Sequence, residues 1–186
     1  METFLFNLEY MSFNLFLALI PVFFGYLMLK AKNKSLKLLY GFIWFIFLPN
    51  TAYILVDIVH LFEQLTKVDL VFKIVLLIQY GLFLLAGALT FIYATYFFER
   101  LIGKNKSRPA ILLILNLIVG FGVILGFVQR TNSWYIFTQP LRVIEDTLAL
   151  LYSPNLVVAS FAFGLLVNII YFYFSKPVIG FGKSIK

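Results

Sequence analysis

Five long apolar stretches divide the chain, and polar residues gather between them. A helix needs about 20 consecutive apolar residues to cross a hydrocarbon core of about 30 Å. Each stretch is close to that length, so the pattern predicts an all-α, polytopic transmembrane helix bundle of about five spans. We expect the spans at residues 11–29, 38–56, 74–96, 110–127 and 156–174, within a single domain covering residues 1–186.

Two secondary patterns add detail to this bundle. Between the fourth and fifth spans, the apolar residues at 141–151 predict a short amphipathic helix lying along the membrane interface. The third span is rich in small residues, which let helices approach closely in lipid, so we expect it at the bundle centre. These small residues are Gly81, Ala86, Gly87, Ala88 and Ala94. The first apolar run has no positive segment before it and no cleavage site after it, so we expect it to be retained.

Composition supports the membrane class and excludes some chemistry. The 186 residues are 62% hydrophobic and 12% charged, whereas a soluble domain has about 45–50% apolar and about 25% charged residues. One soluble core cannot hold the excess, which includes 23 Phe and 11 Tyr. The chain has no cysteine, which excludes disulfides, thiolate nucleophiles and cysteine-ligated metals.

The basic residues are unevenly placed, and their positions predict an orientation. Eleven of the 15 Lys and Arg fall in the loops after the first and third spans and in the C-terminal tail. The positive-inside rule assigns these three segments to the cytoplasm, so we expect the N-terminus outside. Seven of the eight acids lie on the other side, the exception being Glu99. The net charge of +7 then indicates contact with anionic lipid headgroups, and we expect no nucleic-acid partner.

The second span carries an unusual set of polar residues. On a helix with about 100° per residue, Asn50, Tyr53, Asp57 and His60 share an arc of about 80° that opens toward the outside. Pro49 lacks an N–H and leaves a backbone carbonyl without its helical partner. Two interpretations are open: a kinked helix in which Asn50 repairs the lost bond, or a half-broken helix that lines a water-filled cavity.

Asp57 and His60 lie three residues apart and are neighbours on a helix. They fit an interfacial ion pair that caps the helix, a general acid–base pair, or part of a metal site. The chain has one His and no Cys, and it has no nucleophile elbow, phosphate loop or metal motif. We therefore predict no catalytic residue, metal or cofactor, and we rank an enzyme below a binding protein.

Other polar residues reach the outer end of the neighbouring spans. Arg130 ends the fourth span and has three interpretations: it snorkels to the interface, it pairs with a carboxylate of the second span, or it receives an anion such as phosphate. Asn132 follows it, and Trp134 is placed as in an aromatic belt. Asn14 in the first span and Asp69 before the third complete the candidate set as supporting residues.

Three stretches resemble a bacterial family of multi-pass membrane proteins known as domain of unknown function 1361. They are Asn14–Pro21, Leu48–Leu61 with its string Pro-Asn-x-x-Tyr-x-x-x-Asp-x-x-His, and Arg130–Trp134. Where the family more often has Ala-Pro, this chain has Thr51-Ala52 and so one proline fewer. The resemblance covers nearly the whole chain and implies a place in the bacterial cytoplasmic membrane, with no established activity.

Three functions fit these observations. The first is an outward-facing pocket that binds or moves a small polar or anionic solute, lined by Asn50, Tyr53, Asp57, His60 and Arg130. The second is an accessory subunit whose polar stripe contacts the transmembrane helix of a membrane-protein partner. The third is a membrane-embedded enzyme acting on a lipid-linked substrate at the outer leaflet. We favour them in that order.

Overall fold

The computed structural model describes residues 2–184, and it has helices and no strands in that part of the chain. Five helical segments are long and apolar enough to cross a membrane, one of them combining two consecutive helices. The prediction of an all-α polytopic helix bundle is therefore confirmed. The helices are α1 (Glu2–Lys30), α2 (Lys34–Tyr53), α3 (Ile58–Leu65), α4 (Leu70–Ile102), α5 (Arg108–Gln129), α6 (Tyr135–Thr138), α7 (Pro140–Leu151) and α8 (Pro154–Ser184).

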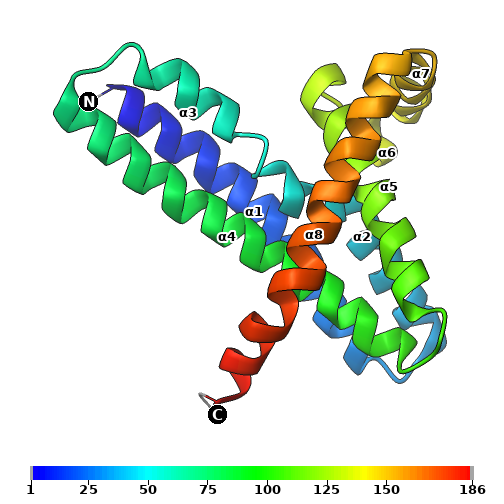
Figure 1. Ribbon diagram of the computed structural model, residues 1–186. Helices are drawn as coiled ribbons and strands as arrows, with labels where there is room; N and C mark the ends of the chain where they lie inside the picture. The colour runs from blue at the N-terminus through cyan, green and yellow to red at the C-terminus, as the bar shows by residue number, and fades with distance from the viewer. Residues whose placement is uncertain (1, 185–186) are drawn as a thin grey trace.

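Both short basic loops lie at the same end of the bundle. In Figure 1 the α1–α2 and α4–α5 connections are at the bottom of the view with the C-terminus, whereas the N-terminus and α7 are at the top. We call these the basic end and the N-terminal end. The arrangement agrees with an odd number of spans, and the assignment of the basic end to the cytoplasm stays a prediction.

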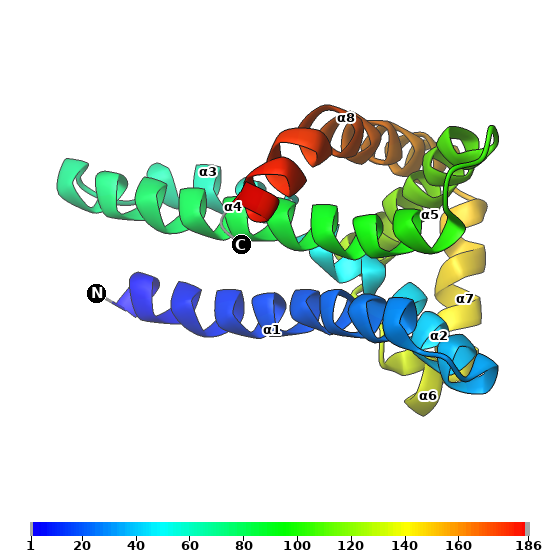
Figure 2. The same ribbon diagram turned by 90° about the horizontal axis from the view of Figure 1, so that it is seen from below.

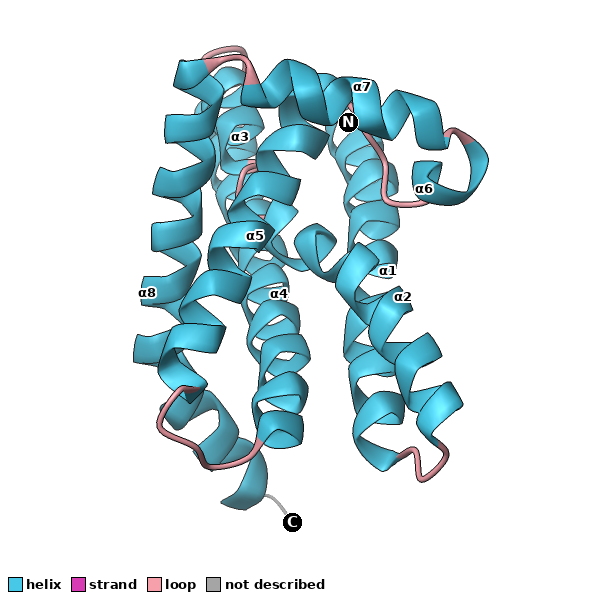
Figure 3. Ribbon diagram, turned by 90° about the vertical axis from the view of Figure 1, so that its right-hand side faces the viewer, coloured by secondary structure: helices cyan, strands magenta, loops and turns pink. Residues whose placement is uncertain are grey.

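A helix is found where the amphipathic segment is predicted. α7 covers Pro140–Leu151, and Figure 3 shows it running across the N-terminal end of the bundle instead of along α8. A helix that crosses the ends of the spans in this way lies where the membrane interface would be.

α4 is the helix around which the others pack. It contacts α1, α2, α3, α5 and α8, and in Figure 2 it lies between α1 on one side and α8 on the other. Gly87 admits the side chain of Ile54, because a Cβ at this glycine would lie 2.6 Å from the Ile54 Cγ2. At Ala94 the backbone carbonyl accepts a hydrogen bond of 3.0 Å from the Trp44 indole. A Cβ placed at Gly81 would have no neighbour within 4 Å, so only some of the small residues serve packing.

α5 and α8 approach so closely that glycine is required on both. A Cβ at Gly120 would lie 2.4 Å from the backbone N of Gly164. Beside this contact, the Asn116 amide donates to the Asn168 Oδ1 at 3.0 Å, and both side chains are buried. Close packing of small residues and hydrogen bonds between helices is the usual way that spans associate in lipid.

The outward faces of the spans are covered with large apolar side chains. Phe6, Phe16, Leu82 and Phe161 each expose more than half of their surface. A soluble monomer rarely exposes such an extended apolar surface. Hydrocarbon around the spans gives these side chains a favourable environment, in agreement with a membrane-embedded bundle.

Candidate functional site

A cavity of about 160 Å³ lies between α1, α2, α5 and the segment that follows α5. We call it the polar cavity. α2 and α5 both start at the basic end, and their last turns line the cavity. The cavity is therefore in the half of the bundle nearer the N-terminal end. Its lining residues are Asn14, Leu17, Pro49, Asn50, Tyr53, Gly122, Gly126, Arg130, Thr131, Asn132 and Ser133.

Asn50 joins α2 to the segment after α5. Its amide donates to the Ser133 hydroxyl at 2.7 Å and to the backbone carbonyl of Phe47 at 3.0 Å. The carbonyl that loses its helical partner to Pro49 is that of Phe45, four residues earlier. Asn50 bonds the carbonyl of Phe47 instead, so the repair of the lost bond by Asn50 is not found. α2 continues through Pro49 as far as Tyr53, so the proline does not end the helix.

Gly122 explains how α5 can lie against the proline. A Cβ at Gly122 would lie 2.6 Å from the Pro49 Cγ, so only glycine fits there. One turn later, a Cβ at Gly126 would lie 3.6 Å from the Tyr53 ring, an ordinary contact distance. The two glycines leave space beside α5, and this space belongs to the polar cavity.

Arg130 brings a positive charge to the cavity in an unusual backbone conformation. It is the C-terminal cap of α5 and has φ 57, the left-handed region, which favours glycine. Holding a residue other than glycine there costs on the order of 1 kcal/mol, and such strain is often found at functional sites. Within residues 2–184, Arg130 makes no ion pair, so of its three interpretations the pairing with a carboxylate is not found.

The segment after Arg130 is held from two sides. The Thr131 hydroxyl donates to the Asp146 carboxylate of α7, and this carboxylate also lies 3.5 Å from the Arg142 Nε. On the other side, the Trp134 ring packs edge-on against Phe13 of α1, with 5.9 Å between centroids. Trp134 therefore supports the cavity wall from outside and does not line it.

The regular helix is interrupted after Tyr53, which corrects the single-helix geometry assumed for Asn50 to His60. The amides of Leu55, Val56 and Asp57 each bond the carbonyl three residues earlier, at 2.9–3.3 Å. Such a turn advances about 120° per residue instead of about 100°, so positions calculated for one regular helix do not hold beyond it. His60 does not line the cavity that Asn50 and Tyr53 line, and its imidazole lies 3.4 Å from the Glu63 carboxylate.

Asp57 is buried at this interruption and lies behind the cavity. Its side chain is 2% exposed, and its Oδ2 accepts a hydrogen bond of 3.2 Å from the amide of Asn14, a lining residue. Asp57 occupies the N-cap position of α3 but makes no side-chain cap bond there. The interpretation as an interfacial ion pair with His60 is therefore wrong, because His60 lies 3.4 Å from the carboxylate of Glu63 instead.

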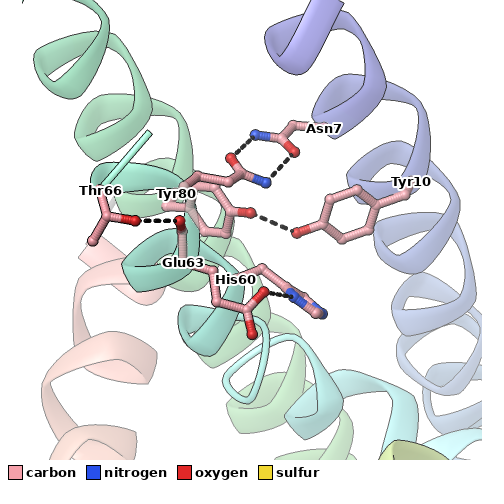
Figure 4. Close-up of polar contacts among 7 residues, drawn as sticks. Asn7, Tyr10, His60, Glu63, Thr66 and Tyr80 are labelled. Atoms are coloured by element: carbon pink, nitrogen blue, oxygen red, sulfur yellow. Dashed lines mark hydrogen bonds and ion pairs between the residues drawn. The ribbon is translucent and has the colours of Figure 1, made fainter. Parts of the chain in front are cut away.

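A second polar group, which the sequence analysis missed, lies farther toward the N-terminal end (Figure 4). The Asn7 and Gln64 side-chain amides bond each other at 2.7 and 2.9 Å, and the Tyr10 and Tyr80 hydroxyls lie 3.0 Å apart. Residues 7, 10 and 14 recur at helical spacing, so a polar stripe on α1 was visible in the sequence. It was missed because the first span was predicted to begin only at residue 11.

The remaining predicted residues lie apart from the cavity. Asp69 is exposed and caps α4, its carboxylate accepting from the Phe72 amide at 2.9 Å. Within the described residues, no group of three or more His, Asp or Glu side chains is arranged to hold a metal ion. Of the ten residues predicted for the site, six line the polar cavity: Asn14, Pro49, Asn50, Tyr53, Arg130 and Asn132.

The comparison with protein families gives one match. A family model described as "Protein of unknown function (DUF1361)" matches residues 13–170, which is most of the chain. The chain belongs to the DUF1361 family. This confirms the resemblance stated from the sequence. The comparisons with curated proteins and with solved structures each found no match.

The matched region contains every residue that lines the polar cavity. Asn7 and Tyr10, the α1 members of the second polar group, precede it. The DUF1361 family has no described function, so a function for this member rests on the geometry of its own side chains.

Proposed function

We propose that the polar cavity is a binding site for a small anion that enters from the N-terminal end. The observation that carries the proposal is the charge of its wall. Arg130 is the one charged residue among the lining residues, and no carboxylate pairs with it within residues 2–184. A guanidinium without a carboxylate partner beside a polar hollow is suited to an anionic oxygen, because charge-assisted hydrogen bonds are about twice as strong as neutral ones.

The other polar groups of the wall are mostly hydrogen-bond donors or hydroxyls. They are the amides of Asn14, Asn50 and Asn132, and the hydroxyls of Tyr53, Thr131 and Ser133. Asn50 and Thr131 already donate their hydrogens within the protein. Donors remain on the amides of Asn14 and Asn132 and on the hydroxyls of Tyr53 and Ser133. Phosphate and carboxylate oxygens accept several hydrogen bonds at once, so these donors beside one arginine favour them over neutral solutes. Asp57 bonds Asn14 and is not among the lining residues. It makes no ion pair with Arg130, but the two charges are close enough to attract each other.

The size of the cavity limits the ligand. Its volume is about 160 Å³, similar to the cavity of about 150 Å³ that accommodates benzene. Drug-sized ligands occupy pockets of about 300–1,000 Å³. Inorganic phosphate, or a carboxylate of a few carbon atoms, fits this space.

On the side toward the basic end, the cavity is followed by tightly packed apolar residues. Leu48 precedes Pro49, and Val119 precedes Gly122 by one turn; they are 0% and 1% exposed and belong to one core cluster. Binding from the N-terminal end needs no rearrangement of this cluster. Movement of the anion across the membrane would require α2 and α5 to separate here.

The test is anion-dependent thermal stabilisation of the purified protein in detergent. Phosphate, sulfate and acetate are compared with sodium chloride of equal ionic strength and with neutral glycerol. A ligand at about 100 times its Kd stabilises the folded state by about 2.7 kcal/mol, so we expect a clear rise in Tm for at least one of these anions. The rise should be clearly smaller in Arg130→Gln than in wild type and unchanged in Lys67→Gln, which removes an exposed charge outside the cavity.

The proposal is overturned if none of these anions raises the Tm beyond the chloride control, or if Lys67→Gln reduces the rise as much as Arg130→Gln. An accessory subunit that contacts a partner's helix would give the first of these results.

A further inference from the structure

A second polar region, distinct from the polar cavity, lies at the basic end between α4, α5 and α8. It consists of two neighbouring hollows that share Tyr96 and Glu99 in their walls. One hollow has a volume of about 420 Å³ and is also lined by Arg100, Lys104 and Arg108. The other, of about 310 Å³, extends along α8 past Lys176. We call the two hollows together the basic cleft.

Glu99 holds the three helices of the cleft together. Its Oε1 lies 3.2 Å from the Arg108 Nη1 of α5, and its Oε2 accepts a hydrogen bond from the Tyr171 hydroxyl of α8. Tyr171 is 1% exposed, whereas the Glu99 and Arg108 side chains are 19% and 36% exposed, so the connection is partly buried. The sequence places one acid on the basic side, and the structure shows that this acid organises the cleft.

The remaining charges of the cleft are positive and uncompensated. Among the described residues, Arg100, Lys104 and Lys176 make no ion pair, and all three are exposed. Glu99 is already engaged by Arg108 and Tyr171, so it neutralises none of them. The cleft therefore presents at least three free cations around a wall that is held by the contacts of Glu99 with α5 and α8.

We propose that the basic cleft binds a phosphate group, carried either by an anionic phospholipid headgroup or by a small soluble phosphate ester. Basic pockets between spans on the cytoplasmic side are suited to anionic headgroups, and arginine binds phosphate in a bidentate manner. The hollow along α8 also has apolar walls at Phe172 and Ile179. Such walls suit the glycerol and upper acyl region of a lipid, whose chains would continue into the bilayer beside α8.

The basic loop between α1 and α2 provides a matched control. It carries Lys32, Lys34 and Lys37, so the triple change to Gln there removes the same charge at the same end of the bundle. None of these lysines lines the basic cleft. The test variant combines Arg100→Gln, Lys104→Gln and Lys176→Gln, which are exposed positions, so we expect it to fold.

Native mass spectrometry of the detergent-solubilised protein measures how much phosphatidylglycerol and phosphatidylcholine each variant retains. In a second arm, thermal shift with glycerol 3-phosphate and inorganic phosphate measures binding of a soluble phosphate, with every variant made in an Arg130→Gln background so that the polar cavity does not contribute. Each basic residue near an anionic phosphate contributes about fivefold in affinity. We expect the cleft variant to lose at least about tenfold in binding of phosphatidylglycerol or of the soluble phosphates, and the α1–α2 loop variant to lose less than about twofold.

If the cleft variant loses only its retention of phosphatidylglycerol, the phosphate that the cleft binds belongs to a lipid headgroup. If it loses only its stabilisation by the soluble phosphates, the cleft binds a free phosphate ester. The proposal is overturned if neither arm responds to the cleft variant, or if the α1–α2 loop variant lowers binding equally. If the triple variant fails to express, Lys104→Gln should by itself lower binding about fivefold, and an unchanged value would also overturn the proposal. Arg130→Gln alone, at the other end, should leave the retention of phosphatidylglycerol unchanged.

Discussion

Two glycines on the same face of α5 allow packing and ligand binding to be separated. A methyl group at Gly122 would lie 2.6 Å from the Pro49 Cγ and 3.0 Å from its Cβ, whereas carbon atoms are in favourable contact at about 3.5–4.0 Å. Gly122→Ala therefore requires α2 and α5 to move apart by about 1 Å. Overpacking of this kind costs about 1–3 kcal/mol.

Gly126→Ala is the matched change one turn later. Its methyl group would lie 3.5 Å from the Thr131 carbonyl and 3.6 Å from the Tyr53 ring, so it fits without displacement. Replacing glycine by alanine within a helix favours folding by up to about 1 kcal/mol. The methyl group occupies part of a cavity of only about 160 Å³, so we expect weaker anion binding with stability kept or raised.

Thermal unfolding in detergent, followed by tryptophan fluorescence, measures both effects. Trp44 is 3% exposed and packs in the core, so its emission reports loss of the fold. Since 1 kcal/mol corresponds to about 2–4 °C for a chain of this size, Gly122→Ala should lower the Tm by about 2–12 °C. Equal Tm values for Gly122→Ala and wild type would refute the close approach of α5 to Pro49. A destabilised Gly126→Ala would refute the open space beside Tyr53.

Three further changes test other parts of the account. Arg130→Gly should keep the Tm or raise it, because glycine favours φ 57. The same change should weaken anion binding about 10–100-fold through loss of a charged hydrogen bond. Titration calorimetry measures the affinity, and an unchanged value would count against a role for Arg130. Gly120→Ala should lower the Tm markedly, because its methyl group would lie 2.4 Å from the α8 backbone, whereas Gly81→Ala, with no neighbour within 4 Å, should not. Asn14→Ala should cost about 1–3 kcal/mol in chemical denaturation, because it leaves the buried Asp57 carboxylate without its donor; a stability equal to wild type would contradict this.

Length and composition were enough to predict the bundle, because each span carries its own apolar run. The short helix predicted at residues 141–151 also matches α7. Polar residues near the outer ends of separate spans were expected to meet there, and Asn14, Asn50 and Arg130 do line one cavity. The bilayer makes this possible, since residues at one depth on neighbouring helices share a plane.

The details that depend on irregular backbone and on helix pairing were not predictable. A helical period does not reveal where the backbone bonds change to the third residue back, so the interruption of the helix between Asn50 and His60 was missed. The partner of Asp57 lies 43 residues away on α1. Which helix faces this carboxylate is decided by the packing of α1 against α2 and α4, and periodicity within one span cannot reveal it.

The central claim is that the polar cavity is open to water at the N-terminal end and not at the basic end. The chain has no cysteine, so Asn50→Cys introduces a single thiol into the cavity wall. Leu48→Cys, two residues earlier and 0% exposed, is the buried control, and Glu63→Cys, whose side chain is 61% exposed, is the accessible one.

The deciding measurement is the rate at which a membrane-impermeant thiol reagent labels each of these three variants from each side of a vesicle. We predict that Asn50→Cys reacts from the same side as Glu63→Cys, that a bound anion slows its reaction, and that Leu48→Cys does not react. Absence of labelling in Asn50→Cys, or labelling of this variant from the side of the basic loops, would contradict the claim.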